Sequence, residues 1–351
     1  MYRPLSNGLA RPKLFPRQHY QDDCCYVNSD SEESPPSPTS SDSSIDEDEV
    51  NRRVKPFWPK YRSLFRARGF RLDTVKDVRL FYIHRVQQPA SDPCRPTPYV
   101  FGHDELQDDE ALCPDAGFPD NLFRGSRISD SKRIVVKAVH AGSREYSVIC
   151  ALSQPPLRND PMNHTIPVVD LFKLPGDNIA FIVMEEWSSN LMATLGPCCL
   201  TRFLSAFRQC IEHAVFLHKH NIAHLDISLM NLLTDYRGHY AYIDYEISRQ
   251  FDKSSIPLVY DYRATEVPPE CDKNTGVNPY KVDVWALAVL ILRACKLTGY
   301  WIPELMHVIK PMLDEDPSRR PSAFGALQAF DKMTASLGYQ LQPTCSESES
   351  H

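Results

Sequence analysis

The sequence predicts an α+β protein with two lobes, a small lobe rich in β-strands followed by a larger lobe made mainly of helices. Residues 122–128 and 133–139 are predicted to be two strands joined by a short polar turn, and the second of them is rich in β-branched residues. A second such pair spans 168–174 and 180–184. Residues 200–219 then repeat apolar side chains at helical spacing. The 351 residues are enough for one such domain of about 250–300 residues with tails.

Composition and charge narrow the class of protein. Hydrophobic residues make up 42% of the chain, and the net charge of −6 gives no indication of a nucleic-acid partner. The 11 cysteines form no C-x-x-C pair, so we expect free thiols in a reducing compartment. The N-terminus has no signal-peptide pattern, and the longest apolar run, Val284–Leu292, is far shorter than the about 20 residues that cross a membrane. We therefore expect an intracellular protein, cytoplasmic or nuclear, with no membrane partner.

Two segments of opposite charge precede the first strand pair. Residues 1–50 form an acidic tail rich in Ser and Pro, which we expect to be disordered because it can bury little apolar surface. Residues 51–121 are expected to be a basic, aromatic extension and linker, which packs on the small lobe rather than binding nucleic acid. Within it, apolar side chains recur at helical spacing in two places: Trp58, Tyr61 and Phe65, then Val75, Val78 and Phe81.

Polar residues interrupt the apolar elements at five positions. Lys137 lies inside a β-branched run, where an unpaired charge is costly. Glu145 opens an amphipathic stretch and could pair with Lys137, or could be a surface residue of that helix. Asp226 and Asn231 lie five apart, and Asp244 follows another apolar run. Phosphoryl transfer from a nucleotide needs such a set, with one carboxylate for the acceptor hydroxyl and two oxygen ligands for Mg²⁺.

Together with three later motifs, these residues resemble the protein kinase superfamily. The later motifs are Pro268-Pro-Glu270, Asp283-Val-Trp285 and Asp316-Pro-Ser-Arg-Arg-Pro321, and the resemblance covers about residues 122–337. It implies a bilobal protein-kinase-like fold, of a divergent, fungal type, and a buried Glu270–Arg320 pair. It also implies divisions into small lobe and hinge at 122–187, helical lobe at 188–337 and a second disordered tail at 338–351.

The resemblance further implies roles for individual residues. Asp226, Lys137 and Glu145 are expected to be catalytic, with Asp226 as the base. Asn231 and Asp244 are expected to bind Mg²⁺. The expected ATP-binding residues include six from the strands, the hinge and the region after the catalytic loop: Lys137, Val135, Met184, Glu185, Trp187 and Leu233. The implied partners are ATP and a protein substrate or protein partner.

Several positions depart from the family pattern. No G-x-G-x-x-G precedes Lys137, so the loop that covers the phosphates is expected to be short or different. Leu225, Ser228 and Glu246 replace an arginine, a lysine and a glycine of the usual motifs. Two hypotheses follow, an active phosphotransferase directed at Ser or Thr, and a pseudokinase that acts as an interaction module. A small-molecule kinase also shares the His-x-Asp-x4-Asn loop, but the three later motifs favour the protein-kinase-like fold.

Overall fold

A computed structural model of the protein describes residues 51, 54–87, 98–100, 108–189, 200–261, 263–273, 275–300, 302–339 and 341. The acidic tail at 1–50 and nearly all of the tail at 338–351, both expected to be disordered, lie outside these residues. No helix in the described ranges is both long and apolar enough to cross a membrane. The cysteines among them, Cys113, Cys150, Cys210, Cys271 and Cys295, are free thiols, as the sequence predicts.

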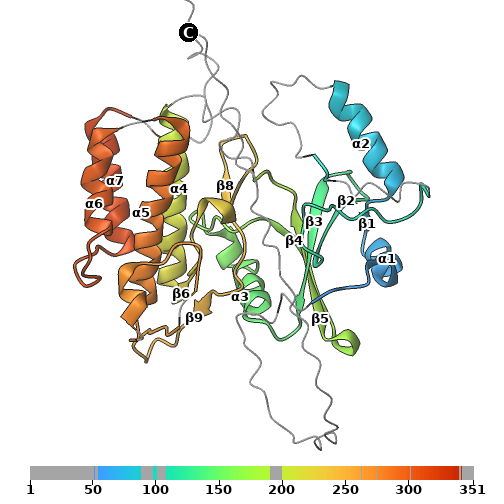
Figure 1. Ribbon diagram of the computed structural model, residues 1–351, viewed down its shortest axis with the longest axis horizontal. Helices are drawn as coiled ribbons and strands as arrows, with labels where there is room; N and C mark the ends of the chain where they lie inside the picture. Colours follow the sequence, from blue (N-terminus) through green and yellow to red (C-terminus); the bar gives the residue numbers. More distant parts are fainter. Residues whose placement is uncertain are drawn as a thin grey trace, which may run out of the picture. The chain divides into compact units, whose positions relative to one another are not determined.

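The β-rich lobe is built on a five-stranded antiparallel sheet with the order β1-β2-β3-β5-β4 (Figure 1). Its strands are β1 (Phe70–Leu72), β2 (Leu122–Arg127), β3 (Arg133–His140), β4 (Val168–Leu174) and β5 (Ile179–Glu185). The register places Lys137 at the centre, opposite Leu122 on one side and Ile182 on the other. Both expected strand pairs are therefore present, and β3 joins them.

The sheet also draws in residues expected to be extension and linker. Phe70 and Leu72 of β1 are buried and pair with β2. This pairing requires Gly125, because a Cβ there would lie 2.5 Å from the carbonyl oxygen of Arg71. Residues 70–72, expected to belong to the extension and linker, therefore form one strand of the sheet.

Two helices of the same segment flank the sheet, α1 (Trp58–Ala67) and α2 (Val75–Gln87) (Figure 1). The aromatic side chains at helical spacing in α1 face inward, where Trp58 lies 5.1 Å from the ring of Phe123 and Phe65 lies 5.0 Å from that of Phe181. Val75 and Val78 of α2 are buried in a separate cluster with Tyr99 and Cys113. The extension therefore packs on the small lobe, as expected.

The helical lobe follows the strands. Its helices are α4 (Leu200–Lys219), α5 (Pro279–Thr298), α6 (Met306–Met312) and α7 (Ala323–Ser336), which lie side by side in Figure 1. Short strands and single turns carry the loops between them: β6 (Ile222–Ala223), β7 (Leu232–Thr234), β8 (Tyr240–Tyr242), β9 (Arg249–Gln250), and the 3-10 turns Leu157–Asn159, Pro175–Asp177, Leu229–Asn231, Pro269–Lys273 and Pro303–Leu305. The whole is an α+β, bilobal fold of the protein kinase type.

One helix belongs to both lobes. The helix α3 (Arg144–Leu152) begins after Ser143, whose hydroxyl accepts a hydrogen bond from the Tyr146 amide at 3.3 Å. Its apolar stripe is buried in the same cluster as the helical lobe: Val148, Ile149 and Leu152. Glu145 lies in the first turn of α3.

Candidate active site

Lys137 of β3 joins two carboxylates from different parts of the chain. Its Nζ lies 2.7 Å from Oε1 of Glu145 and 3.0 Å from Oδ1 of Asp244. The ion pair between Lys137 and Glu145 is thus present, and Glu145 is buried rather than on the surface. The third member, Asp244, has a left-handed backbone with a φ of 64°.

Lys137 and the two carboxylates affect one another's pKa values in this buried setting. Burial alone would lower the pKa of Lys137, but Glu145 and Asp244 raise it above its ordinary value. Burial raises the pKa of Glu145, and Lys137 offsets only part of this effect. For Asp244 the attraction of Lys137 outweighs burial, so its pKa is lowered. Lys137 therefore stays protonated, and Asp244 stays ionised, at neutral pH.

A residue that the sequence reasoning missed holds the far side of Glu145. The side-chain amide of Asn51 donates to Oε2 of Glu145 at 3.0 Å, and its oxygen accepts a hydrogen bond from the His140 amide at 3.0 Å. Asn51 is 1% exposed. Because Glu145 is in the first turn of α3, no earlier turn of that helix can support it, and Asn51 provides the contact instead. No local pattern in the sequence marks this residue.

The loop around Asp226 is held from beneath by Asp283 of α5. The Asp283 carboxylate accepts hydrogen bonds from the amides of His224 at 2.9 Å and Leu225 at 2.8 Å, and lies 2.9 Å from Nε2 of His218. Leu225 has a φ of 67°, a left-handed conformation that is costly for a leucine. These three contacts pin the turn that leads to Asp226.

Asp226 and Asn231 contact each other directly. The side-chain nitrogen Nδ2 of Asn231 donates to Oδ2 of Asp226 at 2.7 Å and to the backbone oxygen of Asp226 at 3.0 Å. The other carboxylate oxygen of Asp226 accepts the Thr265 amide at 2.9 Å. The Ile243 amide donates to the backbone oxygen of Asn231 at 3.0 Å, which ties Asn231 to the residue before Asp244. The catalytic and metal-binding residues expected from the sequence therefore lie in one connected region.

A cavity of about 670 Å³ opens beside Lys137. Its wall includes all six residues expected to bind the nucleotide: Val135, Lys137, Met184, Glu185, Trp187 and Leu233. Glu145, Asp244 and Glu246 also line it, whereas Asp226 and Asn231 do not. Most of the lining is apolar, as in pockets that take an aromatic ring, with charged groups gathered around Lys137.

The altered motif positions have identifiable surroundings. Leu225 is buried in an apolar cluster with Ala223, Val259 and Val277, so an arginine would not fit there without a large cost. Ser228 is 1% exposed. The connection between β1 and β2 is neither short nor glycine-rich, because it runs through residues 73–121 and includes α2.

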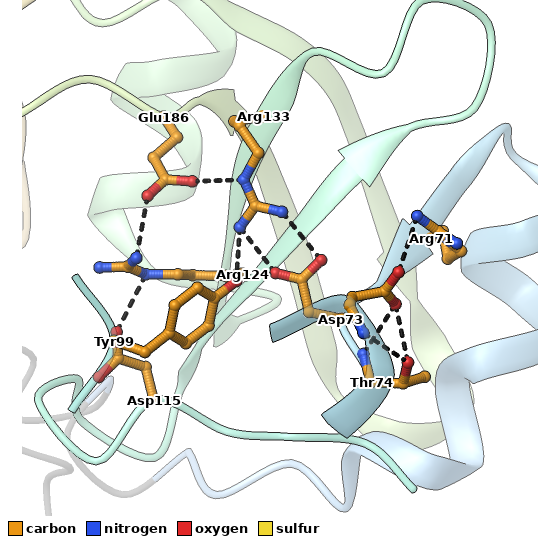
Figure 2. Close-up of polar contacts among 9 residues, drawn as sticks. Arg71, Asp73, Thr74, Tyr99, Asp115, Arg124, Arg133 and Glu186 are labelled. Carbon is orange, nitrogen blue, oxygen red and sulfur yellow. Dashed lines mark hydrogen bonds and ion pairs between the residues drawn. The ribbon is translucent and has the colours of Figure 1, made fainter. Parts of the chain in front are cut away.

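A buried network of charges links this connection to the predicted hinge (Figure 2). Glu186 lies 3.0 Å from Nε of Arg133 and 3.3 Å from Nη1 of Arg124. Arg133 also binds both carboxylate oxygens of Asp73, at 3.0 and 2.6 Å, and Arg124 lies 3.0 Å from Asp115. Burial raises the pKa of Glu186, and the two arginines offset part of that rise. Sequence reasoning missed this network because its acids come from three separate places: Asp73 and Asp115 in the segment expected to be extension and linker, and Glu186 in the predicted hinge.

The buried ion pair between Glu270 and Arg320, which the sequence predicts, is also present. Arg320 binds Glu270 through two hydrogen bonds of 2.6 and 2.7 Å, and Arg320 is 1% exposed. The Arg320 guanidinium also donates to the backbone oxygens of Asp314 and Lys281. This bidentate geometry is the strongest form of carboxylate recognition by arginine.

Comparison with known proteins points to one family. A family model described as the protein kinase domain matches residues 168–302. Over 178 residues the chain is 28% identical to Crinkler effector protein 8 of Phytophthora infestans, covering 47% of this chain and 29% of that protein. Over 142 residues it is 25% identical to CBL-interacting serine/threonine-protein kinase 13 of Arabidopsis thaliana, covering 32% of this chain and 28% of that protein. The chain thus spans less than a third of the length of either relative.

Proposed function

This chain belongs to the protein kinase superfamily, and we propose that it is an active phosphotransferase that uses ATP and Mg²⁺ and acts on a Ser or Thr hydroxyl of a protein. The observation that carries the proposal is the double contact of Lys137 with Glu145 and Asp244. It brings together the lysine for the phosphates, the acid that orients this lysine, and a metal ligand.

Each residue then has a defined task. Glu145 holds the Lys137 ammonium so that it meets the phosphates of a nucleotide whose base lies between apolar side chains such as Val135 and Leu233. The contacts from Thr265 and Asn231 orient the Asp226 carboxylate, which accepts the proton of the acceptor hydroxyl.

Two side chains suit a magnesium ion. The Asn231 nitrogen is engaged with Asp226, so its amide oxygen is the ligand atom, and the ionised Asp244 supplies a carboxylate. Within the described ranges no group of three or more His, Cys, Asp or Glu could hold a metal ion. These two residues therefore fit an ion that also takes oxygens from the nucleotide, whose charge it would neutralise.

The first test is nucleotide binding measured as thermal stabilisation. ATP with Mg²⁺ should stabilise the wild-type protein by about 2.7 kcal/mol at 100 times its Kd. Lys137→Met and Asp244→Asn should lose most of this shift, while Lys60→Met on the surface of α1 should keep it. A wild-type protein whose melting temperature does not respond to ATP would rule out the proposal.

The second test is phosphate transfer to a library of peptides containing Ser or Thr. Asp226→Asn should keep the thermal shift but lose transfer by about 100-fold or more, because the general base is removed. Transfer that survives this substitution would remove Asp226 from its assigned role.

One observation favours a second candidate function, a pseudokinase that binds nucleotide without transferring phosphate. Glu246, which takes the place of a glycine, lines the cavity and adds a negative charge near Asp244. In addition, Ser228 supplies no positive charge beside Asp226. A thermal shift with ATP in the wild type, without transfer to any peptide or to the protein itself, would select this candidate.

A further inference from the structure

We infer that Val54 and Lys55 belong to the phosphate-side wall of the nucleotide site and that Lys55 binds the phosphates directly. The inference rests on the proposed function, because it assigns a further ligand to the same site. Lys55 and its neighbour Val54 both line the cavity beside Lys137, although they precede the first helix and the sheet.

Residues 118–122, which lead into β2, offer few backbone N–H donors to a phosphate. Residues Phe118–Leu122 line the cavity just before β2. The Phe118 amide donates to the Asp115 oxygen at 2.9 Å, and the Leu122 amide donates to the Pro119 oxygen at 2.9 Å. Pro119 has no N–H group. These three residues cannot cradle an anion through their backbone, so the site depends more on cationic side chains.

Among the described cations that line the cavity, Lys55 has the weakest pairing. Lys137 is held by Glu145 and Asp244, and Arg124 lies within the buried network of Figure 2. Lys55 contacts Asp120 at 3.0 Å, but the two side chains are 73% and 68% exposed. Such exposed pairs contribute little. Lys55 can therefore turn from Asp120 to a phosphate, whose charge-assisted hydrogen bond is stronger.

Acidic side chains around the cavity increase the need for this lysine. Asp120, Glu145, Glu185, Glu186, Asp244 and Glu246 all line it. Among the residues that the structure describes, the cations that line the cavity are Lys55, Arg124 and Lys137. All three contact acids, but the contact of Lys55 is the exposed one. A polyphosphate entering this field is repelled unless a metal ion and a further cation oppose it.

Asn51 fixes the chain just before Val54 and Lys55. It is bonded to Glu145 and to the end of β3, so it keeps the following residues beside the same cluster that holds Lys137. The Val54 amide donates to the Asn51 backbone oxygen at 3.0 Å, which forms a turn directly before Lys55. We therefore assign Asn51 as a positioning residue and Lys55 as a nucleotide-binding residue.

The test compares the binding of ATP with Mg²⁺ and of adenosine, measured by calorimetry on the full chain. Lys55→Ala should raise the Kd for ATP about tenfold, equal to about 1.4 kcal/mol, and leave the Kd for adenosine unchanged. Lys60→Ala serves as the matched control, since Lys60 pairs with Asp177 outside the cavity. Asp120→Asn should tighten ATP binding, because Lys55 loses its competing partner.

Asn51→Ala should weaken ATP more than adenosine, which simple loss of folded protein would not do. Melting temperatures without ligand confirm that each variant is folded; Lys55 is exposed, so its variant should melt like the wild type. If Lys55→Ala binds ATP as tightly as Lys60→Ala, while the wild type binds ATP, the inference is overturned and the proposed function stands. If the wild type binds neither ligand, both are overturned.

Discussion

The two walls of the cavity beside Lys137, the proposed nucleotide site, are held together in different ways. In the helical lobe, the polar residues lie close in sequence, and one carboxylate, that of Asp283, organises the loop between His224 and Asp226 through backbone amides. The support from Asp283 is distant in sequence, 58 positions from Leu225, but it comes from one residue. In the β-rich lobe, the supports come from two separate segments before β2: Asn51, 94 positions from Glu145, and Asp73, 60 positions from Arg133. The match to the kinase family begins only at residue 168, after β3 and α3.

This difference indicates which features of the fold tolerate rebuilding. A loop that must place an acid, an amide and a second acid within one region needs its residues at fixed spacing. A wall that must only cover a ligand and orient one lysine can take its supports from anywhere in the chain. The strand order of the sheet is therefore regular, while the connection between β1 and β2 carries a helix and buried charges.

The largest expected effect is on the helical lobe. Glu270→Ala leaves the guanidinium of Arg320 buried without its carboxylate, which should lower the free energy of unfolding by about 3–5 kcal/mol in a urea titration. The control is Asp331→Asn, which removes a partly exposed pair with Arg208 and should cost no more than about 1 kcal/mol. Equal losses in the two variants would contradict the role given to the buried pair.

A smaller effect is expected when the β-rich wall is weakened. Asp73→Asn removes the charge that accepts two hydrogen bonds from Arg133 in Figure 2, and should cost about 1.5–3 kcal/mol. Since Arg133 also holds Glu186 at the predicted hinge, this variant should bind ATP more weakly even where it is fully folded. The folded fraction of Glu270→Ala should bind ATP normally. The opposite pattern would mean that the two walls are not separately supported.

The smallest effect comes from pH and concerns the helical lobe. Burial, with nearby His164 and His224, lowers the pKa of His213 well below its ordinary value. Below about pH 6.5 the His213 side chain binds a proton in the unfolded chain but stays neutral in the native protein. The free energy of unfolding therefore decreases as the pH falls, by at most about 1.4 kcal/mol per pH unit.

A substitution at His213 isolates this contribution. His213→Phe should be less stable at pH 7.5, because the His164 amide and the Tyr245 hydroxyl lose their partner. It should nevertheless show a flatter pH dependence between pH 6.5 and 5.5 in the same urea titrations. An unchanged slope would show that His213 does not titrate on unfolding.

The sequence predicts the strands, the main helices and the pairs Lys137–Glu145 and Glu270–Arg320, because each belongs to a short motif or a clear period. The three-residue strand β1 is too short to show an alternating pattern. No pattern in the sequence marks Arg124 as buried, yet its charge is buried against acids supplied by other segments. Asn51 has no neighbours that mark it. Contacts between residues far apart in the sequence depend on the tertiary structure, which local sequence patterns do not encode.

Gly125 allows β1 to join the edge of the β-rich sheet. Its missing side chain is the space that admits the Arg71 carbonyl. A methyl group there would push against rigid backbone and separate β1 from the remaining four strands. Because α1, Asn51 and Lys55 come before β1 in the chain, the pairing of β1 with β2 adds to the contacts that hold this N-terminal part beside the cavity.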